Sequence, residues 1–407
     1  MRLLAFNAGS SSLKFDLMET PAGGPARRVA SGTFADRADG SGRFELQTAA
    51  AVAPPATPVR TLAEAAEFVV DWLQRPAADR ASPLAGLAAT VHRIVHGGAV
   101  FAATARLGAA ELDALAGISM LAPLHNPPAL AVIDAVRERL GSAVPVVGVF
   151  DTAYYVDLPE AAYRYAVPAR WSEEFGVRRY GFHGTAHRSL CAGVRAGSRG
   201  NSGANRIVSL QLGRGCSVTA SVGGRAVATS MGFTPLEGLV MGTRSGDLDA
   251  GALLHVMERT GMTVAQMRRE LNQDCGLLGL SGRTADMRDL LALEAAGDPG
   301  AALAIAVFCR RARHYLAAFM AELGGADAIA FGGGIGENCP DIRRRIVRGL
   351  DWAGVELDES ANRLAVGVAA AIATPASRVS VHVVPVDEAS VLAAEAEALL
   401  GGAGQGC

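Results

Sequence analysis

The chain has 407 residues, enough for two domains of ordinary size that each bury a hydrophobic core. Half of the residues are hydrophobic, only 5% are aromatic, and 48 are glycine, a mixture that suits an α/β protein with many tight turns. A formal net charge of −2 provides no broad basic surface, which argues against nucleic acid as the main partner.

Hydropathy and cysteine usage indicate a cytoplasmic protein. No segment approaches the roughly 18 consecutive apolar residues of a membrane span, so we expect no membrane partner. The apolar N-terminus turns polar at Asn7, far too early for a signal peptide. The six cysteines are scattered without paired spacing, as expected for reduced thiols and not for a disulfide framework or a zinc site.

Apolar periodicity predicts strands that alternate with helices. We expect a Pro- and Ala-rich surface loop at 50–58. The alternation predicts a mainly parallel, helix-covered sheet in each of two halves, with the ligand at the carboxyl ends of the strands. The predicted strands are 3–6, 13–18, 43–47, 88–95, 144–150, 207–212, 218–222, 328–331 and 379–385, and the predicted helices are 61–73, 127–140, 301–323 and about a dozen C-terminal residues.

The strand–loop–strand pattern at the N-terminus returns in the middle of the chain. Asn7 and Gly9 of the first copy correspond to Gln211 and Gly213 of the second. This weak repeat suggests two related halves that face each other.

Three Gly- or Ser-rich loops directly follow predicted strands, at 7–12, 213–217 and 332–338. Glycine lets backbone N–H groups approach phosphate oxygens, and small hydroxyls add donors, so the three loops together favour a nucleotide site. Tight turns alone also require glycine, which is the structural alternative. The sequence lacks a GxxxxGK[ST] loop and a GxGxxG motif at a βαβ opening, which disfavours the two common nucleotide-binding folds.

Lys14 is the single lysine among 38 basic residues. It lies two residues beyond the serines of the first loop, from where an ammonium group can reach the same phosphates. The alternative is chance survival on a solvated strand.

Arg93 and Arg244 lie in Gly-rich segments with few charges, and each guanidinium offers a planar fork for a carboxylate or phosphate. The structural alternative is a buried ion pair, for example between Arg244 and Asp247.

His183 and His187 have the i, i+4 spacing of a possible metal pair on one helical turn. Gly184 instead suggests a loop that enters a helix, and no Cys or acidic residue lies at a ligand spacing. We therefore favour one histidine that donates to a phosphoryl oxygen and a second with a structural hydrogen bond.

Asp151 and Glu388 each follow a predicted strand, and Asn7 offers an amide oxygen. Mg²⁺ prefers a few such oxygens and completes its shell with water and substrate phosphates. The alternative role is helix N-capping, which suits Asp387 and also Asp151.

Several segments together resemble the acetate kinase (acetokinase) family. They occur in the family's order and cover essentially the whole chain. The segments are NAGSSSLKF (7–15), HRIVHGG (92–98), APLHNP (122–127), VFDTA (149–153), RRYGFHGT (178–185), 229–247, 276–290 and GIGEN (334–338).

The resemblance implies the two-domain α/β fold of the actin-like ATPase (ribonuclease H-like) type, with a central cleft, and a homodimer. Residues 1–152 plus 388–407 would form the acyl-substrate and phosphate domain, and residues 153–387 the nucleotide-binding and dimerisation domain. The implied reaction is the reversible, Mg²⁺-dependent phosphorylation of acetate by ATP to acetyl phosphate and ADP, with Mn²⁺ as an alternative metal.

The resemblance also implies residue roles. Asp151 matches the family's catalytic acid, and His183 and Arg244 match its transition-state stabilisers. Arg93 would hold the substrate carboxylate, beside an apolar acid pocket formed by Val95, Leu124, Phe182 and Pro235. Asn7 and Glu388 would hold the metal. The nucleotide and its phosphates would contact Ser10, Ser12, Lys14, Gln211, Leu212, Gly213, Arg214, Gly215, Asp286, Met287, Arg288, Gly336, Glu337, Asn338, Cys339 and Pro340.

The implied chemistry requires charge neutralisation more than a base. A carboxylic acid with a pKa of roughly 4 to 5 is already ionised at pH 7. The obstacle is the approach of one anion to a polyphosphate, which arginine, lysine and Mg²⁺ relieve. Asp151 is then better suited to orienting an arginine or Mg²⁺ than to removing a proton.

The sequence departs from the family pattern at three places. Residues 211–215 read QLGRG where the family usually has HLGNG, so Arg214 replaces a neutral amide and can alter the choice of phosphoryl donor. Tyr154 and Tyr155 replace the usual aromatic–His pair, and Asp387 stands where Asn is common.

Alternatives therefore remain open. They are a kinase of the same fold that uses propionate or another short acid, or pyrophosphate as donor; a nucleotide-binding sensor without chemistry; and a metallohydrolase built on His183 and His187.

Overall fold

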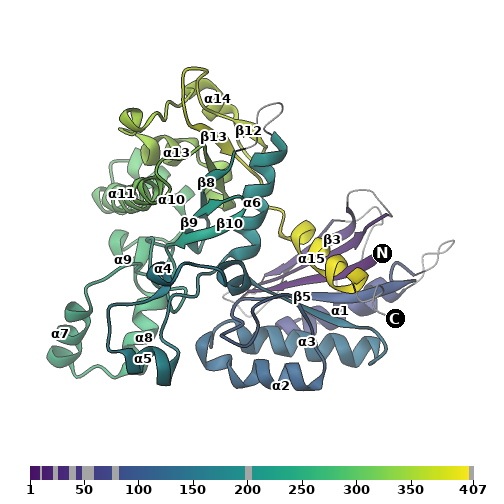
Figure 1. Cartoon of the computed structure of the whole chain (residues 1–407). Coiled ribbons are helices and arrows are strands. Elements are labelled where there is room, and N and C mark those ends of the chain that lie inside the picture. The colour runs from purple at the N-terminus through teal and green to yellow at the C-terminus, as the bar shows by residue number, and fades with distance from the viewer. Residues whose placement is uncertain are drawn as a thin grey trace. The chain divides into compact units, whose positions relative to one another are not determined.

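The computed structural model describes residues 1–9, 12–21, 26–35, 43–47, 59–75, 82–197 and 204–402. The chain divides into two compact units, the first formed by Met1–Ala153 with Asp387–Cys407 and the second by Tyr154–Val386 (Figure 1). Ser10 and the loop predicted at 50–58 lie outside the described residues. Within the described part of the chain, no helix is long and apolar enough to span a membrane.

The first unit is built on a seven-stranded sheet with the order β4-β3-β2-β1-β5-β7-β6. Its centre, β1-β5-β7, is parallel, whereas the remaining neighbours are antiparallel. The strands are β1 (Arg2–Ala8), β2 (Ser12–Glu19), β3 (Arg27–Ala35), β4 (Arg43–Gln47), β5 (Leu87–Ile94), β6 (Ala105–Arg106) and β7 (Val146–Phe150).

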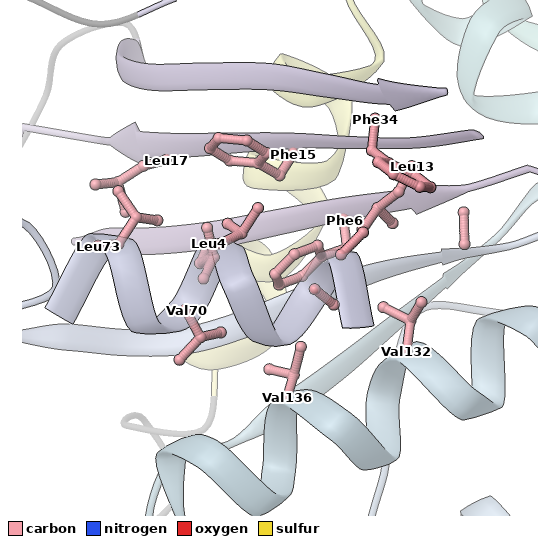
Figure 2. Close-up of a cluster of buried hydrophobic side chains, with 14 of the residues drawn as sticks. Leu4, Phe6, Leu13, Phe15, Leu17, Phe34, Val70, Leu73, Val132 and Val136 are labelled. Atoms are coloured by element: carbon pink, nitrogen blue, oxygen red, sulfur yellow. The ribbon is translucent and has the colours of Figure 1, made fainter. Parts of the chain in front are cut away.

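Helices cover both faces of this sheet. One face packs against α1 (Leu62–Gln74) and α3 (Asn126–Leu140), and Figure 2 shows the buried aliphatic and aromatic side chains between them. The other face packs against α15 (Glu388–Gly402), so the C-terminal helix completes the core of the N-terminal sheet. The remaining elements are α2 (Ala109–Gly117) and the 3-10 helices Ser119–Leu121 and Asp151–Tyr155.

The second unit contains a six-stranded sheet with the order β10-β9-β8-β11-β13-β12. Leu190 and Val194 of α6 (Gly184–Gly197) pack on Ile207 and Ala328 of this sheet, and α11 (Pro299–Glu322) also contacts β8 and β9. The strands are β8 (Arg206–Leu212), β9 (Cys216–Val222), β10 (Arg225–Thr229), β11 (Ala328–Gly332), β12 (Ala370–Ala371) and β13 (Ser380–Val383).

Shorter helices complete the second unit. They are α4 (Glu160–Tyr163), α5 (Ala169–Phe175), α7 (Ala250–Thr260), α8 (Val264–Gln273), α9 (Gly276–Ser281), α10 (Met287–Ala295), α12 (Gly333–Asn338), α13 (Pro340–Val347), α14 (Glu359–Leu364) and the 3-10 helix Asp351–Ala353. The prediction of a loop at 332–338 is therefore wrong, because these residues end β11 and form α12.

The two sheets share one topology, which supports the repeat seen in the sequence. The order β3-β2-β1-β5-β7 has the same sequence of antiparallel and parallel neighbours as β10-β9-β8-β11-β13. The prediction of mainly parallel sheets is wrong. β1 is joined to β2, and β8 to β9, by only three residues, which permits a hairpin but no parallel crossover.

Candidate active site

Polar side chains lie at the ends of the central strands of the first unit. Strand register places Asn7 of β1 beside Lys14 of β2 on one side and beside Arg93 of β5 on the other. Side chains alternate along a strand, and Leu3 and Ala5 pack against α15, so Asn7 continues the row that faces this helix. Asp151 follows β7 directly, and Glu388 is the first residue of α15.

These side chains form one hydrogen-bonded group, which we call the strand-end cluster: Asn7, Arg93, Asp151 and Glu388. Arg93 donates to both carboxylate oxygens of Asp151, from Nε over 3.0 Å and from Nη2 over 2.6 Å. Its Nη1 donates to Asn7 Oδ1 over 2.9 Å, and its Nε lies 3.2 Å from Glu388 Oε1. Asn7 Nδ2 in turn donates to Glu388 Oε2 over 2.9 Å.

Burial makes this cluster electrostatically strong. The Arg93 side chain is 13% exposed, and the Asp151 side chain is wholly buried. Burial alone lowers the pKa of Arg93, but the carboxylates of Asp151 and Glu388 outweigh it and raise that pKa above its ordinary value. Arg93 therefore stays cationic, and Asp151 fixes its planar fork in one orientation.

Other predicted residues of the first unit surround the cluster. Lys14 is exposed on β2, directly opposite Asn7. Asp387 caps α15 by accepting from the backbone N–H of Ser390 over 3.2 Å, which confirms its predicted capping role. Of the residues assigned to the apolar pocket, Val95 is buried and Leu124 is exposed.

His183 in the second unit has an unusual backbone. It has φ = 58°, the one described non-glycine residue with positive φ, and α6 begins at the next residue, so the predicted entry of a loop into a helix is confirmed. Such a conformation costs of order 1 kcal/mol and is common at functional sites. The His183 ring bonds to Ser217 through Nδ1 over 2.8 Å.

His187 occupies a buried hydrogen-bonded position beneath His183. Its Nε2 lies 2.7 Å from Ser217 Oγ, and its Nδ1 lies 2.7 Å from Ser209 Oγ. Burial, with a smaller contribution from His183, holds the pKa of His187 well below its usual range. Both of its nitrogens are therefore bonded to serine hydroxyls, which favours the structural role over a metal pair with His183.

Arg244 lies close to His183, with Gly215 between them. A Cβ atom at position 215 would lie 3.3 Å from His183 Nε2 and 3.7 Å from Arg244 Nη1, so glycine keeps this space open. We call His183, Gly215 and Arg244 the histidine–arginine cluster. Burial lowers the pKa of Arg244, a cost that a bound anion would offset.

The proposed ion pair between Arg244 and Asp247 does not form. Asp247 instead pairs with Arg311 over 3.0 Å and accepts from Tyr315 over 2.8 Å. The Arg244 Nη1 donates to the carbonyl of Pro235 over 3.2 Å, and no carboxylate of the described residues pairs with it. Its charge is therefore uncompensated within the described part of the second unit.

Three of the segments predicted to bind nucleotide, 211–215, 286–288 and 336–340, lie in the second unit. Gly333 has φ = 75°, and a Cβ atom there would lie 2.6 Å from the Leu212 carbonyl, so α12 packs tightly on the end of β8. The Glu337 carboxylate accepts from Gly333 N over 2.9 Å and fixes this turn. The buried Oε1 of Gln211 has no hydrogen-bond partner among the described residues.

The remaining predicted nucleotide contacts vary in exposure. Asp286 caps α10, and its carboxylate pairs with Arg288 over 2.6 Å. Arg214 is exposed, and its carbonyl accepts from Gly242 N over 3.1 Å. The others divide into the buried Leu212, Met287, Gly336 and Cys339, the half-buried Ser12, Gly213 and Pro340, and the exposed Asn338. Of the two remaining residues assigned to the apolar acid pocket, Phe182 is buried and Pro235 is half-buried.

The strand-end cluster supplies oxygen donors of the kind that Mg²⁺ prefers. An amide oxygen of Asn7 and the carboxylates of Asp151 and Glu388 lie within one hydrogen-bonded group. The described residues contain no group of three His, Cys, Asp or Glu side chains that could hold a metal alone. The donor set therefore fits a metal that takes most of its ligands from water and phosphate.

The roles of two important residues were not predicted from the sequence. Ser217 joins His183 to His187, and Arg343, wholly buried on α13, ties the turn at Gly336 to α14. The role of Ser217 could have been suspected, because Ser209 and Ser217 are polar residues at positions of buried strands. No feature of the sequence indicates the role of Arg343, since arginine on a short helix usually faces solvent.

Comparison with known proteins places this arrangement in a family. The model of the acetokinase family matches residues 2–394. An acetate kinase of Solibacter usitatus is 42% identical over 401 residues, covering 97% of each chain. Crystal structures of an acetate kinase from Porphyromonas gingivalis and a propionate kinase from Francisella tularensis superpose with TM-scores of 0.83 and 0.87. Both are 32% identical to this chain. The match to the acetate kinase covers 98% of this chain and 99% of that one, and the match to the propionate kinase covers 97% and 98%.

These matches also confirm the predicted fold class. Two helix-covered sheets of mixed topology, alike over nearly the whole chain to solved acetate and propionate kinases, form an α/β fold of the actin-like ATPase type. Family model, sequence identity and fold agree across the chain, which therefore belongs to the acetokinase family.

Proposed function

We propose that this chain is an acetate kinase that transfers the γ-phosphoryl group of ATP to acetate, reversibly and directly. The observation that carries the proposal is the largely buried Arg93, held by Asp151 and Asn7 in a chain of the acetokinase family. Such a guanidinium is a preorganised receptor for a small carboxylate.

The acceptor needs binding and orientation more than activation. Acetate is ionised at pH 7, so one carboxylate oxygen attacks the γ-phosphorus while the bond to ADP breaks, and no proton is transferred. Arg93 holds the carboxylate, and Asp151, bonded to Arg93 through both oxygens, acts as the residue that positions it. Val95, Leu124, Phe182 and Pro235 line the methyl group of the acetate in this proposal.

The histidine–arginine cluster stabilises the charge that spreads over the transferring group. Arg244 has no carboxylate partner within the described part of its unit, and Gly215 leaves space beside it and His183. Loss of one preorganised donor of this kind costs about 2.7–4 kcal/mol of barrier. Lys14 supplies a further positive charge to the phosphates from the first unit.

The nucleotide binds to the second unit in this proposal. The contacts come from the segments 211–215, 286–288 and 336–340, and Gly333 packs against Gln211 and Leu212 of the first of these. The orphaned Gln211 Oε1 is an acceptor suited to a ligand donor, and Ser10 and Ser12 contribute to phosphate binding. Mg²⁺, or Mn²⁺ in its place, would be held by Asn7 and Glu388 and would neutralise phosphate charge when bound.

A donor and acceptor screen tests the function. Acyl phosphate, trapped as its hydroxamate, is measured with ATP, GTP or pyrophosphate as donor and acetate, propionate or butyrate as acceptor. We expect the highest kcat/KM with ATP and acetate. Activity with pyrophosphate and none with ATP would overturn the donor, and absence of acyl phosphate with every pair would leave a nucleotide-binding sensor.

Propionate is the second candidate acceptor, because a solved propionate kinase shares the fold at 32% identity. One additional methylene in an apolar pocket changes binding by only about 1–3 kcal/mol. We therefore expect propionate to react measurably but with a lower kcat/KM. A kcat/KM for propionate above that for acetate would favour the second candidate.

We also propose a cytoplasmic homodimer. What supports the dimer is a set of exposed apolar side chains on and beside α7 and α8, where Leu254 and Val264 are 62% and 64% exposed. Sedimentation velocity of the wild type and of L254E/V264E tests this, with a monomeric double variant expected. A wild type that sediments as a monomer at all concentrations would contradict it.

A further inference from the structure

A pocket of about 490 Å³ in the second unit is lined almost entirely by arginine. Its walls are α11 and the C-terminal half of α13. Besides Ala306 and Cys309, the lining consists of Arg310, Arg313, Arg344, Arg345 and Arg348. A volume of this size accommodates a small molecule.

Helical spacing explains why the guanidinium groups converge. Arg310 and Arg313 lie three residues apart on α11, and Arg344 and Arg348 lie four apart at the end of α13, so each pair shares a helix face. Like charges at these spacings destabilise a helix by a few tenths of a kcal/mol per pair. Each pair therefore places like charges next to each other, a cost that a counter-anion would offset.

Neighbouring carboxylates neutralise only part of the array. Arg345 pairs with Glu294 through two hydrogen bonds of 2.8 Å, and Asp341 pairs with both Arg344 and Arg345. No carboxylate lines the pocket itself. Five cations against two anions leave a net excess of three positive charges.

Among the described residues, the remaining three arginines either have no partner or bind backbone carbonyls. Within the described part of the chain, Arg310 and Arg348 have no ion pair and no side-chain hydrogen bond, and both are exposed. Arg313 donates to the carbonyls of Ile346, over 3.0 Å, and Arg345. Arg313 thereby caps carbonyls at the end of α13 that would otherwise repel an anion.

We propose that this pocket binds a small molecule that carries two or more phosphate groups. The planar guanidinium fork matches phosphate oxygens, and an excess of three positive charges calls for a multiply charged ligand. The pocket is separate from the segments proposed to bind ATP. The proposed ATP segments include Gly336–Pro340, which lead into the first residue of α13. The pocket instead uses Arg344, Arg345 and Arg348, near the C-terminal end of that helix. A ligand here and the nucleotide would therefore contact opposite ends of one helix.

Isothermal titration calorimetry with inorganic tripolyphosphate tests the site, with saturating ADP present to fill the nucleotide site. We expect binding to the wild type, and at least tenfold weaker binding to R310Q/R348Q and to R310E/R348E. The control R75E/R363E matches the charge change of the second variant at exposed arginines elsewhere and should bind as the wild type does.

Two further measurements separate this site from the catalytic one. R244A should retain tripolyphosphate binding, and R310Q/R348Q should retain the wild-type kcat for acyl phosphate formation without tripolyphosphate. The proposal is overturned if the wild type gives no binding heat, if R310Q/R348Q binds as tightly as the wild type, or if R244A abolishes binding. None of these results bears on whether acetate is the acceptor.

Discussion

Asn7 and Arg93 lie side by side on parallel strands β1 and β5, and Arg93 Nη1 donates to Asn7 Oδ1 over 2.9 Å. Adjacent strands thus bring together a proposed metal ligand and the proposed carboxylate receptor. The same guanidinium is fixed by Asp151, the residue that follows the next strand, β7. Three neighbouring strand ends therefore supply one binding surface.

Replacing Arg93 tests the receptor. We expect R93A to raise the KM for acetate by about 10- to 150-fold, the equivalent of ~1.5–3 kcal/mol for hydrogen bonds to a charged group. R93K keeps the charge but loses the two-pronged geometry, and we expect an intermediate KM. Steady-state hydroxamate assays at saturating ATP measure both. An unchanged KM in R93A would show that the carboxylate binds elsewhere.

His183 is expected to act mainly on kcat. H183A should lower kcat by about 10²–10³ while changing the KM for acetate little, because the ring stabilises charge in the transition state. Alanine also tolerates the φ of 58° poorly, so H183N is the matched control, since asparagine adopts this conformation more readily. If H183N regains wild-type kcat, backbone geometry and not the imidazole is responsible.

Arg343 is expected to stabilise the nucleotide segment. Its guanidinium donates to the carbonyls of Gly336, Glu337, Asn362 and Ala365, and burial lowers its pKa to about 10. R343M would leave these acceptors without a donor, and we expect a loss of at least about 3 kcal/mol in unfolding free energy.

Urea denaturation followed by circular dichroism measures that loss, and the KM for ATP should rise in parallel. R348M is the matched control on the same segment, because Arg348 is exposed and unpaired among the described residues. If R343M and R348M were equally stable, the hydrogen bonds of Arg343 would not stabilise the nucleotide segment as proposed.

Acid stability should depend on His92. This side chain is buried against the Phe6 ring, and burial lowers its pKa from 6.5 to about 3. Below pH 6.5 the unfolded chain binds a proton that the folded chain does not, so stability falls as the pH drops from 6.5 towards 3. His92 alone accounts for about 2 kcal/mol between pH 6.5 and 4.5.

We expect H92F to flatten that dependence by this amount, measured as unfolding free energy from urea titrations at several pH values. H92F also removes a 3.2 Å hydrogen bond to Thr90, so its stability at pH 7.5 serves as the reference for each variant. A pH dependence identical to that of the wild type would mean that His92 is protonated in the folded state.

The sequence predicted elements better than their connections. Each predicted strand, and each of the three helices predicted with residue limits, overlaps an observed element and begins and ends within two residues of it. These predictions succeed because apolar periodicity reflects burial directly. The strands β3 and β10 were missed, as were the two-residue strands β6 and β12. β3 begins with two arginines, and both β3 and β10 carry small residues such as Ser31 and Ala226 that give little periodic signal. The sheets were predicted to be mainly parallel because strands and helices alternate along much of the chain. The three-residue links between β1 and β2 and between β8 and β9, which require antiparallel neighbours, were given too little weight.

The candidate site was predicted as residues but not as contacts. Gly-rich loops and isolated charges identified Asn7, Arg93, Asp151, His183 and Arg244. Periodicity contains no information on register, so the two-pronged bond between Arg93 and Asp151 could not be foreseen. Asp247 was the nearest acid to Arg244 in sequence, yet it pairs with Arg311 from α11, a contact between segments far apart in the chain.

The first unit is assembled from both ends of the chain, and this affects how it can form. Leu392, Ala393 and Ala396 of α15 cover the sheet face that contains Leu3, Val91 and Val149. On a ribosome, that face stays without its covering helix until residues 388–402 have been made, which is after the whole second unit, continuous from Tyr154 to Val386, has been made. The second unit can therefore reach its native state first, and truncation of the last fifteen residues should impair the first unit selectively.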